Sequence, residues 1–360
     1  MVDKDRSSSE VYIWATGQDD NIGDSLLRRA YISELRAHGR VVVWVGESSQ
    51  QFIAGLGLSE SDRIIGNYFR WFAHALIAGI RRPTLVAVNA GEVPISRRGA
   101  FRMMTLAFLL GPLRMRGGRG VWVGAGIPVR SANRYLVRPY SLVAGQCTYV
   151  RFRDPESVSL VADSVEVEPD WAFSLGTPIE HWSTPSSRAH LALVMRGDRA
   201  RPSAEWITWV KQISEALNLK PIVVVQVKRD NEMAEWLGRE LDCVVSVWDD
   251  SDHSRREATV RRIYAESRVV VGDRLHGLIV AATEGAVPIG WVESATGKIQ
   301  RHFGVIGLEW VGKCEGSPAA DYEVLSESAL SSMVNQLEVA VAEARIRLDR
   351  VGNEMRESTA

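Results

Sequence analysis

The chain has 360 residues, of which 46% are hydrophobic and 24% charged, and its 43 Lys and Arg residues nearly balance its 44 Asp and Glu residues. This length suggests two domains and excludes one small module, and the balanced charge excludes a strongly basic nucleic-acid binder. Three widely spaced cysteines exclude a disulfide framework, and no apolar run reaches the roughly 20 residues of a membrane span. The first ten residues are charged and serine-rich, so we expect no secretory signal and a cytoplasmic protein.

Strand-like and helical patterns alternate through the first half of the chain. Residues 11–15 predict a strand, residues 18–24 a polar loop, and residues 25–38 a helix that ends at Gly39. Further strands are predicted at residues 41–45, 85–88, 121–123 and 149–152. Such alternation predicts a parallel sheet covered by helices.

The second half of the chain follows a stretch rich in Pro, Ser and Thr, which predicts a linker at 178–189. The C-terminal segment 326–360 predicts a long amphipathic helix, since its apolar residues fall on one face. Between them, strands are expected at 191–195, 222–227, 244–248 and 269–271, and helices at 204–217, 230–241, 255–267 and from about 276 or 278 onward.

The predicted fold is therefore α/β, with two Rossmann-like parallel-sheet domains at 1–177 and 190–325. In such folds a ligand lies beside the carboxyl ends of the strands, and we expect the active cleft between the two domains. Functional residues should then follow strands in both halves of the chain.

The most informative segment is 269–289, where a buried strand leads into Arg274 and His276 at the start of a helix. The free N–H groups of a helix N-terminus favour an anion, and an arginine adds a forked donor for carboxylate or phosphate. A histidine exchanges protons near neutral pH. The alternative is structural: an arginine that caps the helix and a histidine packed in the core.

Four motifs in this order resemble those of the polysaccharide pyruvyltransferase family. They are Asn-Ile-Gly-Asp at 21–24, Arg-Asp-Pro-Glu-Ser at 153–157, Pro-Asp-Trp-Ala-Phe at 169–173, and Arg-Leu-His at 274–276 with Gly-Ala-Val-Pro at 285–288. The resemblance covers about residues 11–312. It implies a glycosyltransferase-B-like fold and transfer of pyruvate from phosphoenolpyruvate onto two sugar hydroxyls as a cyclic ketal. One departure is Asn-Ala-Gly-Glu-Val-Pro at 89–94, where the family usually carries a run of glycines.

The donor pocket needs several cations, because phosphoenolpyruvate carries a carboxylate and a phosphate. We assign His276 as the acid and base and Arg274 as the anion clamp, and we expect Arg153 and Arg196 to bind the donor as well. The resemblance adds Lys298, which lies where the family has a basic residue. Each has a structural alternative: a salt bridge for Arg153, a turn for Arg196 and a solvated loop for Lys298. We expect no metal and no cofactor besides the donor substrate.

The loop after the first strand is the predicted acceptor site. Gly23 allows close backbone approach to a ligand, and Asn21 and Asp24 either bind the acceptor or cap the following helix. Asp170 is expected to be structural or to pair with Arg153, and Asp154 to cap a helix that begins at Pro155.

Residues 81–119 are rich in arginine and contain one acid, Glu92. This segment suits an acidic acceptor, such as a lipid- or nucleotide-linked saccharide, or the anionic inner face of the plasma membrane. The structural alternative is a buried helix with solvated flanks. Its arginines are Arg81, Arg82, Arg97, Arg98, Arg102, Arg114, Arg116 and Arg119.

The sequence thus predicts a phosphoenolpyruvate-dependent ketal pyruvyltransferase of cell-envelope or exopolysaccharide biosynthesis. Two alternatives stay open: a nucleotide-sugar-dependent glycosyltransferase or epimerase of the same fold, and a non-catalytic saccharide-binding protein. The acceptor sugar and the ketal positions are open as well. The C-terminal helix either crosses back onto the first domain or forms the seam of a homo-oligomer. No nucleic-acid partner is expected.

Overall fold

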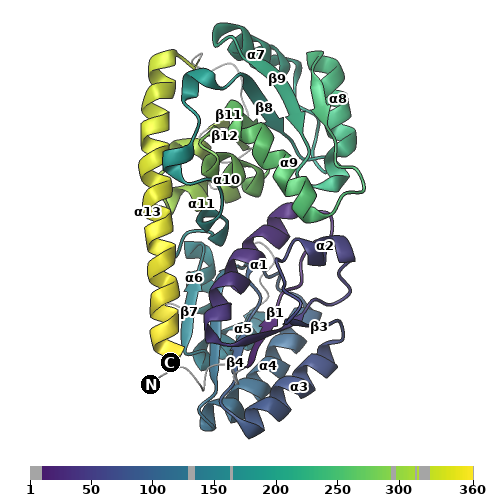
Figure 1. The fold of residues 1–360 in the computed structure, drawn as a ribbon, viewed down its shortest axis with the longest axis vertical. Coiled ribbons are helices and arrows are strands. Elements are labelled where there is room, and N and C mark those ends of the chain that lie inside the picture. Colours follow the sequence, from purple (N-terminus) through teal and green to yellow (C-terminus); the bar gives the residue numbers. More distant parts are fainter. Residues whose placement is uncertain are drawn as a thin grey trace. The chain divides into compact units, whose positions relative to one another are not determined.

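The computed structural model describes residues 10–128, 134–162, 165–292, 297–312, 314–315 and 325–359 (Figure 1). These residues form two compact units. Unit 1 consists of the residues up to Asp19, Asp24–Trp171 and the residues from Arg347 onward, and unit 2 consists of Asp20–Gly23 and Ala172–Ile346. The division differs from the predicted domain ranges, because residues 20–23 and the predicted linker 178–189 belong to unit 2 and the C-terminal helix is shared.

Unit 1 contains a parallel sheet with the strand order β3-β2-β1-β4-β6-β5, in which β7 also pairs with β6. Its central strands are apolar because helices cover the sheet and bury both faces. The strands are β1 (Glu10–Trp14), β2 (Arg40–Trp44), β3 (Arg63–Ile65), β4 (Leu85–Ala87), β5 (Gly91–Glu92), β6 (Arg119–Gly126) and β7 (Tyr149–Phe152).

The helices of unit 1 include one that begins earlier than the sequence predicts. Helix α1 starts at Ile22 rather than at Ser25, because the Asn21 side-chain oxygen accepts a hydrogen bond from the Gly23 N–H at 3.0 Å and so begins the helix. The helices are α1 (Ile22–Leu35), α2 (Gln50–Ala54), α3 (Tyr68–Arg81), α4 (Arg97–Met115), α5 (Arg134–Gln146) and α6 (Pro155–Val161).

A hydrophobic core of unit 1 lies between the sheet and helices α3 to α5. Alternate residues of β1 and β2 contribute Tyr12, Trp14, Val42 and Trp44 to it, as the two-residue period of a strand requires. The apolar stretch of α4, which the sequence predicts as a buried helix, supplies its inward face from Met103 to Leu113.

Unit 2 contains a second parallel sheet, with the order β10-β9-β8-β11-β12-β13. The strands are β8 (His190–Val194), β9 (Lys220–Val224), β10 (Val244–Ser246), β11 (Ser267–Gly272), β12 (Val287–Val292) and β13 (Cys314–Glu315). The helices are α7 (Ala204–Ala216), α8 (Asn231–Leu241), α9 (His253–Ala265), α10 (Leu275–Thr283) and α11 (Lys298–Gly304). The predicted alternation of strands and helices is thereby confirmed in both halves.

The long C-terminal helix α13 (Glu327–Thr359) is also confirmed. Its predicted apolar face is buried, with Leu330, Leu337 and Val341 at most 1% exposed. Residues from Arg347 onward belong to unit 1, where Glu354 accepts a hydrogen bond from the Tyr149 hydroxyl at 2.8 Å. Of the two predicted roles, the structure therefore supports the return of this helix to the N-terminal part of the chain. None of the helices in the described ranges is both long and apolar enough to cross a bilayer.

Candidate functional site

Two of the four sequence motifs meet within unit 2. His276 lies in the first turn of α10 and is 8% exposed, and its ring packs directly against Gly23. A Cβ atom built on Gly23 would lie 2.5 Å from His276 Cγ, which is far inside van der Waals contact. Gly23 thus makes room for the His276 ring, and its predicted approach to a ligand stays a prediction.

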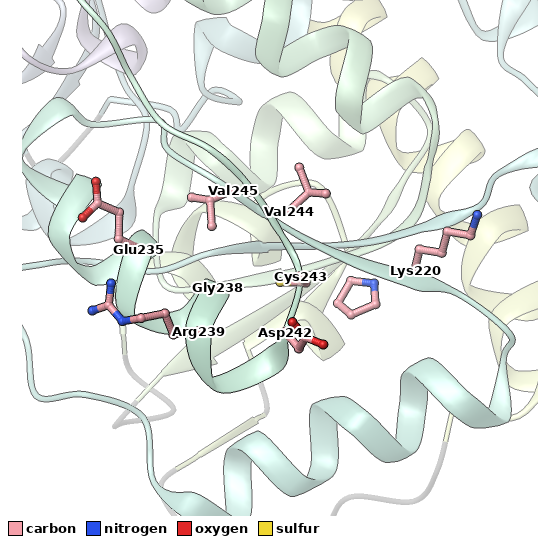
Figure 2. A pocket seen from close by; sticks show the side chains of 9 residues that line it. Lys220, Glu235, Gly238, Arg239, Asp242, Cys243, Val244 and Val245 are labelled. Atoms are coloured by element: carbon pink, nitrogen blue, oxygen red, sulfur yellow. The ribbon is translucent and has the colours of Figure 1, made fainter.

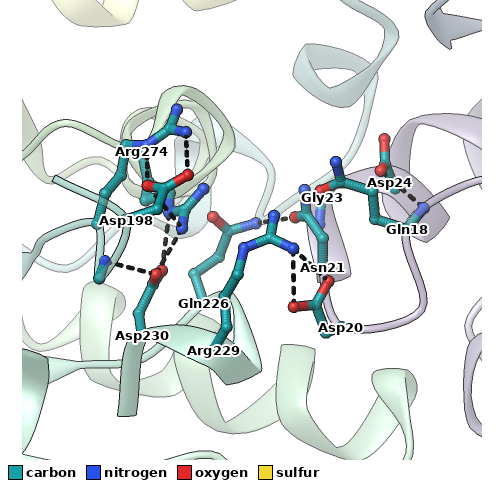
Figure 3. A network of polar contacts seen from close by, with 12 residues as sticks. Gln18, Asp20, Asn21, Gly23, Asp24, Asp198, Gln226, Arg229, Asp230 and Arg274 are labelled. Atoms are coloured by element: carbon teal, nitrogen blue, oxygen red, sulfur yellow. Dashed lines mark hydrogen bonds and ion pairs between the residues drawn. The ribbon is translucent and has the colours of Figure 1, made fainter. Parts of the chain in front are cut away.

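The segment that carries Asn21 is fixed by the residues that follow β9. Asn21 Oδ1 accepts a hydrogen bond from Gln226 Nε2 at 2.9 Å, and the Lys228 N–H donates to the Asp20 carbonyl at 2.7 Å. Arg229 also donates from Nη1 to both carboxylate oxygens of Asp20, at 3.1 and 3.0 Å (Figure 3). These contacts position Asn21 relative to the carboxyl end of the sheet in unit 2.

Arg274 is held by a buried carboxylate that sequence reasoning missed. Its Nε donates to Asp230 Oδ2 at 2.7 Å and its Nη2 donates to Asp230 Oδ1, and the two side chains are 7% and 2% exposed (Figure 3). The Gly197 N–H also donates to Asp230, at 2.7 Å. Asp230 therefore orients Arg274 and offsets part of its charge. Within the described residues Nη1 of Arg274 makes no hydrogen bond.

Arg196 and Asp198 lie in a turn after β8, which is the structural alternative to donor binding that the sequence gives for Arg196. Arg196 donates from Nε and Nη2 to the two carboxylate oxygens of Asp198, at 2.8 and 2.7 Å. This pairing raises the pKa of Arg196 and holds the pKa of Asp198 far below its ordinary value. Since both side chains are partly exposed, the pair is accessible to solvent and to ligands.

Asp273 stands directly before Arg274 and is 6% exposed. Burial raises its pKa to about 6, against the opposing effects of Arg199 and of the hydrogen bond from the Arg196 N–H at 2.8 Å. A carboxyl group that exchanges protons near neutral pH is thus adjacent in sequence to the Arg-Leu-His motif. Sequence reasoning missed it because an aspartate after a strand is typical of a helix cap.

In unit 1, Arg153 follows β7 and forms the predicted ion pair with Asp170. Its Nη1 donates to Asp170 Oδ2 at 2.6 Å, and both residues are 1% exposed. Among the described residues the Nε atom of Arg153 has no hydrogen-bond partner, and a Cβ on Gly126 would lie 2.7 Å from it. Arg153 is therefore fixed by a carboxylate and keeps one buried N–H group unused.

The rest of the Arg-Asp-Pro-Glu-Ser motif is structural. Asp154 caps α6 by accepting from the Ser157 N–H at 2.9 Å, with Pro155 in the first turn, as predicted. The Ser157 hydroxyl donates to Asp154 Oδ2 at 2.8 Å and accepts from the Ile127 N–H at 2.6 Å. The motif thereby ties the start of α6 to the end of β6.

Asp24, which we predicted to bind the acceptor, pairs with a buried arginine that sequence reasoning missed. Arg28 Nη1 donates to the Asp24 carbonyl at 2.6 Å and to Oδ1 at 3.1 Å, and Arg28 Nε donates to Asn89 Oδ1 at 3.0 Å. Burial lowers the pKa of Arg28, which the Asp24 carboxylate opposes and nearby Arg153 reinforces. Asn89 begins the loop that departs from the family pattern, and here it packs against Arg28. The spacing of Asp24 and Arg28, four residues apart on one helix face, is the available sequence signal.

Lys298 is the first residue of α11 and is half-buried, so it is not the solvated loop lysine that the sequence leaves as the alternative. The residues before Gly297 in its predicted segment, 294–296, lie outside the described part of the chain. The structure therefore places Lys298 at a helix start after β12 and leaves its role as a donor ligand a prediction.

A separate surface hollow in unit 2 does not coincide with these residues. It lies where α8 ends and β9 and β10 begin, and Lys220, Glu235, Arg239, Asp242 and Cys243 are among its lining residues (Figure 2). Because ligands of parallel α/β sheets bind at the carboxyl ends of the strands, this hollow is at the opposite edge from the expected site.

Similarity to solved structures defines the class of fold. HepE of Anabaena in complex with UDP matches 97% of this chain and 99% of its own, at 10% identity and a TM-score of 0.57. The glycotransferase of kitacinnamycin matches 98% and 99%, at 12% identity and 0.52. A Thermobaculum terrenum O-GlcNAc transferase mutant matches 98% and 67%, at 11% identity and 0.50. The chain therefore has the glycosyltransferase-B-like fold that the sequence predicts.

The family model for polysaccharide pyruvyl transferases matches residues 21–290, three quarters of the chain. The chain belongs to this family, and it is a transferase in the broad sense that the family defines. The matched range contains the four motifs used above. No curated protein matches the chain by sequence.

Proposed function

We propose that this protein transfers pyruvate from phosphoenolpyruvate to two hydroxyl groups of a saccharide, as a cyclic ketal, in the synthesis of a cell-envelope or secreted polysaccharide. The observation that supports this most is the meeting of the Asn-Ile-Gly-Asp and Arg-Leu-His motifs in unit 2, where Gly23 packs against His276. Family membership supplies the reaction class. A cytoplasmic location is part of the same proposal.

The donor would bind through its two anionic groups. At the N-terminus of α10, free backbone N–H groups favour an anion, and Arg274 adds Nη1 beside them. Asp230 keeps the guanidinium in one orientation, which limits the entropy lost when a ligand binds. Arg196 and Lys298 are the further donor ligands that we propose in unit 2, and Arg153 is the one that we propose in unit 1.

The reaction needs proton transfers that balance without an added acid or base. One proton adds to the methylene carbon of phosphoenolpyruvate and gives an oxocarbenium-like centre at the adjacent carbon. One sugar hydroxyl attacks that carbon, phosphate then leaves and gives a second oxocarbenium-like centre, and the other hydroxyl attacks this centre. Each attack releases one proton. One of the released protons replaces the proton given to the methylene carbon, and the other leaves with phosphate.

His276 is the residue we propose for these transfers. It lies in the first turn of α10, the helix whose N-terminus we propose as the donor site, and its ring packs against Gly23 of the Asn-Ile-Gly-Asp motif. A single positioned acid and base contributes about 10²–10⁴-fold to a rate. Asp273 is the alternative proton donor, because its pKa of about 6 keeps part of it protonated near neutral pH.

The test is a comparison of donors. We expect phosphoenolpyruvate to raise the melting temperature of the wild-type protein. We also expect that, when the protein is incubated with phosphoenolpyruvate and a panel of saccharides, one saccharide gains a pyruvate ketal that mass spectrometry detects. Stabilisation by UDP or GDP with none by phosphoenolpyruvate would instead identify a nucleotide-sugar enzyme. Saccharide binding with no phosphate released would identify a non-catalytic binding protein.

A further inference from the structure

Helices α3 and α4 of unit 1 expose an unusual amount of apolar side chain to solvent. Along α4 a series of exposed residues recurs every three or four positions, with Pro112 between Phe108 and Met115, so it forms one stripe along the helix. The same spacing recurs on α3, with Ala73 between Phe69 and Ile77. We call this surface the α3–α4 face. Its large apolar residues and their exposed fractions are Phe69 (61%), Ile77 (49%), Ile80 (56%), Phe101 (56%), Met104 (36%), Phe108 (70%) and Met115 (83%).

The two helices lie side by side, so the two stripes belong to one surface (Figure 1). The Tyr68 hydroxyl is 2.5 Å from Thr105 Oγ1, and a Cβ on Gly79 would overlap the Leu113 side chain, which shows close helix packing. Near the N-terminal ends of both helices the surface is hollowed between Phe69, Phe101 and the arginines at 97, 98 and 102.

The charge of this face is of one sign. Neither α3 nor α4 contains Asp or Glu. Arg102 stacks over the Trp44 ring, at 5.0 Å from its centroid. The exposed arginines of the two helices form no ion pair within the described ranges, and they are Arg70, Arg81, Arg97, Arg98 and Arg114.

We propose that the α3–α4 face docks the protein on an anionic lipid bilayer. Exposed Phe and Met side chains enter the boundary between headgroups and acyl chains, and the unpaired arginines contact lipid phosphates. Single exposed apolar residues are common, but aligned stripes on two adjacent helices with cations around them are typical of an interaction surface.

Charge favours a lipid surface over a second copy of the chain as the occupant. A symmetric dimer through this face would bring like-charged arginines against each other, with no acid on either helix to offset them. An anionic bilayer supplies the complementary charge and an apolar interior at once. From the sequence alone, residues 81–119 could face an acidic substrate, an anionic membrane or solvent. The exposed apolar stripes favour the membrane, because neither of the other two would stabilise exposed apolar side chains.

Vesicle sedimentation tests the proposal. Wild-type protein should bind vesicles of phosphatidylglycerol and phosphatidylcholine, with binding that rises with the phosphatidylglycerol fraction and falls with salt. Replacing Arg97 and Arg98 by Glu should lower the partition coefficient onto these vesicles by at least about fivefold per position. One arginine near an anionic surface contributes about that factor to binding. Phe101→Ser with Phe108→Ser should abolish the part of the binding that resists high salt.

Matched changes in unit 2 serve as controls. Arg239→Glu reverses an exposed charge and Ile346→Ser removes an apolar side chain that is 59% exposed, and both should bind vesicles as the wild type does. Equal binding by all variants, or no vesicle binding by folded wild-type protein, would overturn the proposal. So would self-association in ultracentrifugation that the Phe101→Ser and Phe108→Ser changes abolish, because the face would then be an interface between copies. If inorganic pyrophosphate, at the same phosphate concentration as the lipid, displaced the protein from the vesicles, the face would bind a soluble anion instead.

Discussion

At the scale of single residues, the contact between Gly23 and His276 explains why two motifs far apart in sequence occur together. The glycine leaves space that the imidazole occupies, and the histidine stands at a helix N-terminus where anions are favoured. The sequence predicts both residues as functional, but a single sequence does not show that two residues so far apart in the chain are in contact. That contact arises from the hydrogen bonds of residues 20–23 with the segment after β9.

Gly23→Ala should damage activity more than stability. The added methyl group collides with His276 and displaces its ring, and a displacement of about 1 Å at a reacting group costs about 10²-fold in rate. Turnover and melting temperature should be measured together. Gly304→Ala is the control, since a Cβ there meets nothing within 4 Å. Equal activity of the two variants would contradict the role assigned to this contact.

Asp230→Asn should destabilise unit 2 strongly. Removing the bonded partner of a buried ion pair leaves Arg274 with only the partly exposed Asp198, 3.9 Å away, at a cost of about 3–5 kcal/mol. Asp198→Asn breaks a partly exposed pair with Arg196 and should cost about 0–1 kcal/mol. Denaturant unfolding of both variants measures the difference, and similar losses would show that Asp230 does not hold Arg274 as described.

Glu168 should make the stability of unit 1 depend on pH. Burial raises its pKa from 4.5 to about 8, although bonds from the Trp171 ring and the Gly124 N–H oppose the shift. The native state therefore keeps a proton that the unfolded chain loses near pH 4.5, so stability falls as the pH rises toward 8. In Glu168→Gln the decrease in melting temperature between about pH 5.5 and 8.5 should be smaller than in wild type. The exposed Glu215→Gln should behave as wild type, and identical profiles for all three proteins would refute the assignment.

At the scale of elements, the strands and most helices follow from the sequence because parallel strands are buried on both faces and read as continuous apolar runs. Short elements such as β3 and α2 were not predicted, since three to five residues carry too little periodicity. The start of α1 was placed three residues late because Asn21 caps it through its side chain while Gly23 lies inside the first turn. Capping by Asp154 was predicted, because Asp-Pro at a helix start has a local signal.

Ser157 links the start of α6 to the end of β6, so its replacement should lower the stability of unit 1. Ser157→Ala leaves the Ile127 N–H and one Asp154 oxygen without a buried partner, which costs about 1–3 kcal/mol. Ser159→Ala is the matched control on the same helix, because its hydroxyl is exposed and bonds only the Pro155 carbonyl. Thermal unfolding distinguishes the two, and a Ser157→Ala protein as stable as the control would contradict the link between α6 and β6.

At the scale of the whole molecule, the order of motifs predicts the fold class and the family, whereas the sequence names a carboxylate partner for Arg153 alone, as one of two roles for Asp170. Asp230 and Asp170 are distant in sequence from Arg274 and Arg153, and only the folded chain brings each acid to its arginine. The sequence predicts Arg274 and Arg153 as donor ligands, with a helix cap and a salt bridge as their structural alternatives. In the folded protein each arginine is oriented by a buried carboxylate.

The most direct test of this account is the rate of phosphate release from phosphoenolpyruvate in the presence of a saccharide that accepts pyruvate. The account predicts release by the wild-type protein and a decrease of about 10²–10⁴-fold in His276→Ala, with stabilisation by phosphoenolpyruvate retained through Arg274. Release at the wild-type rate in His276→Ala would contradict it.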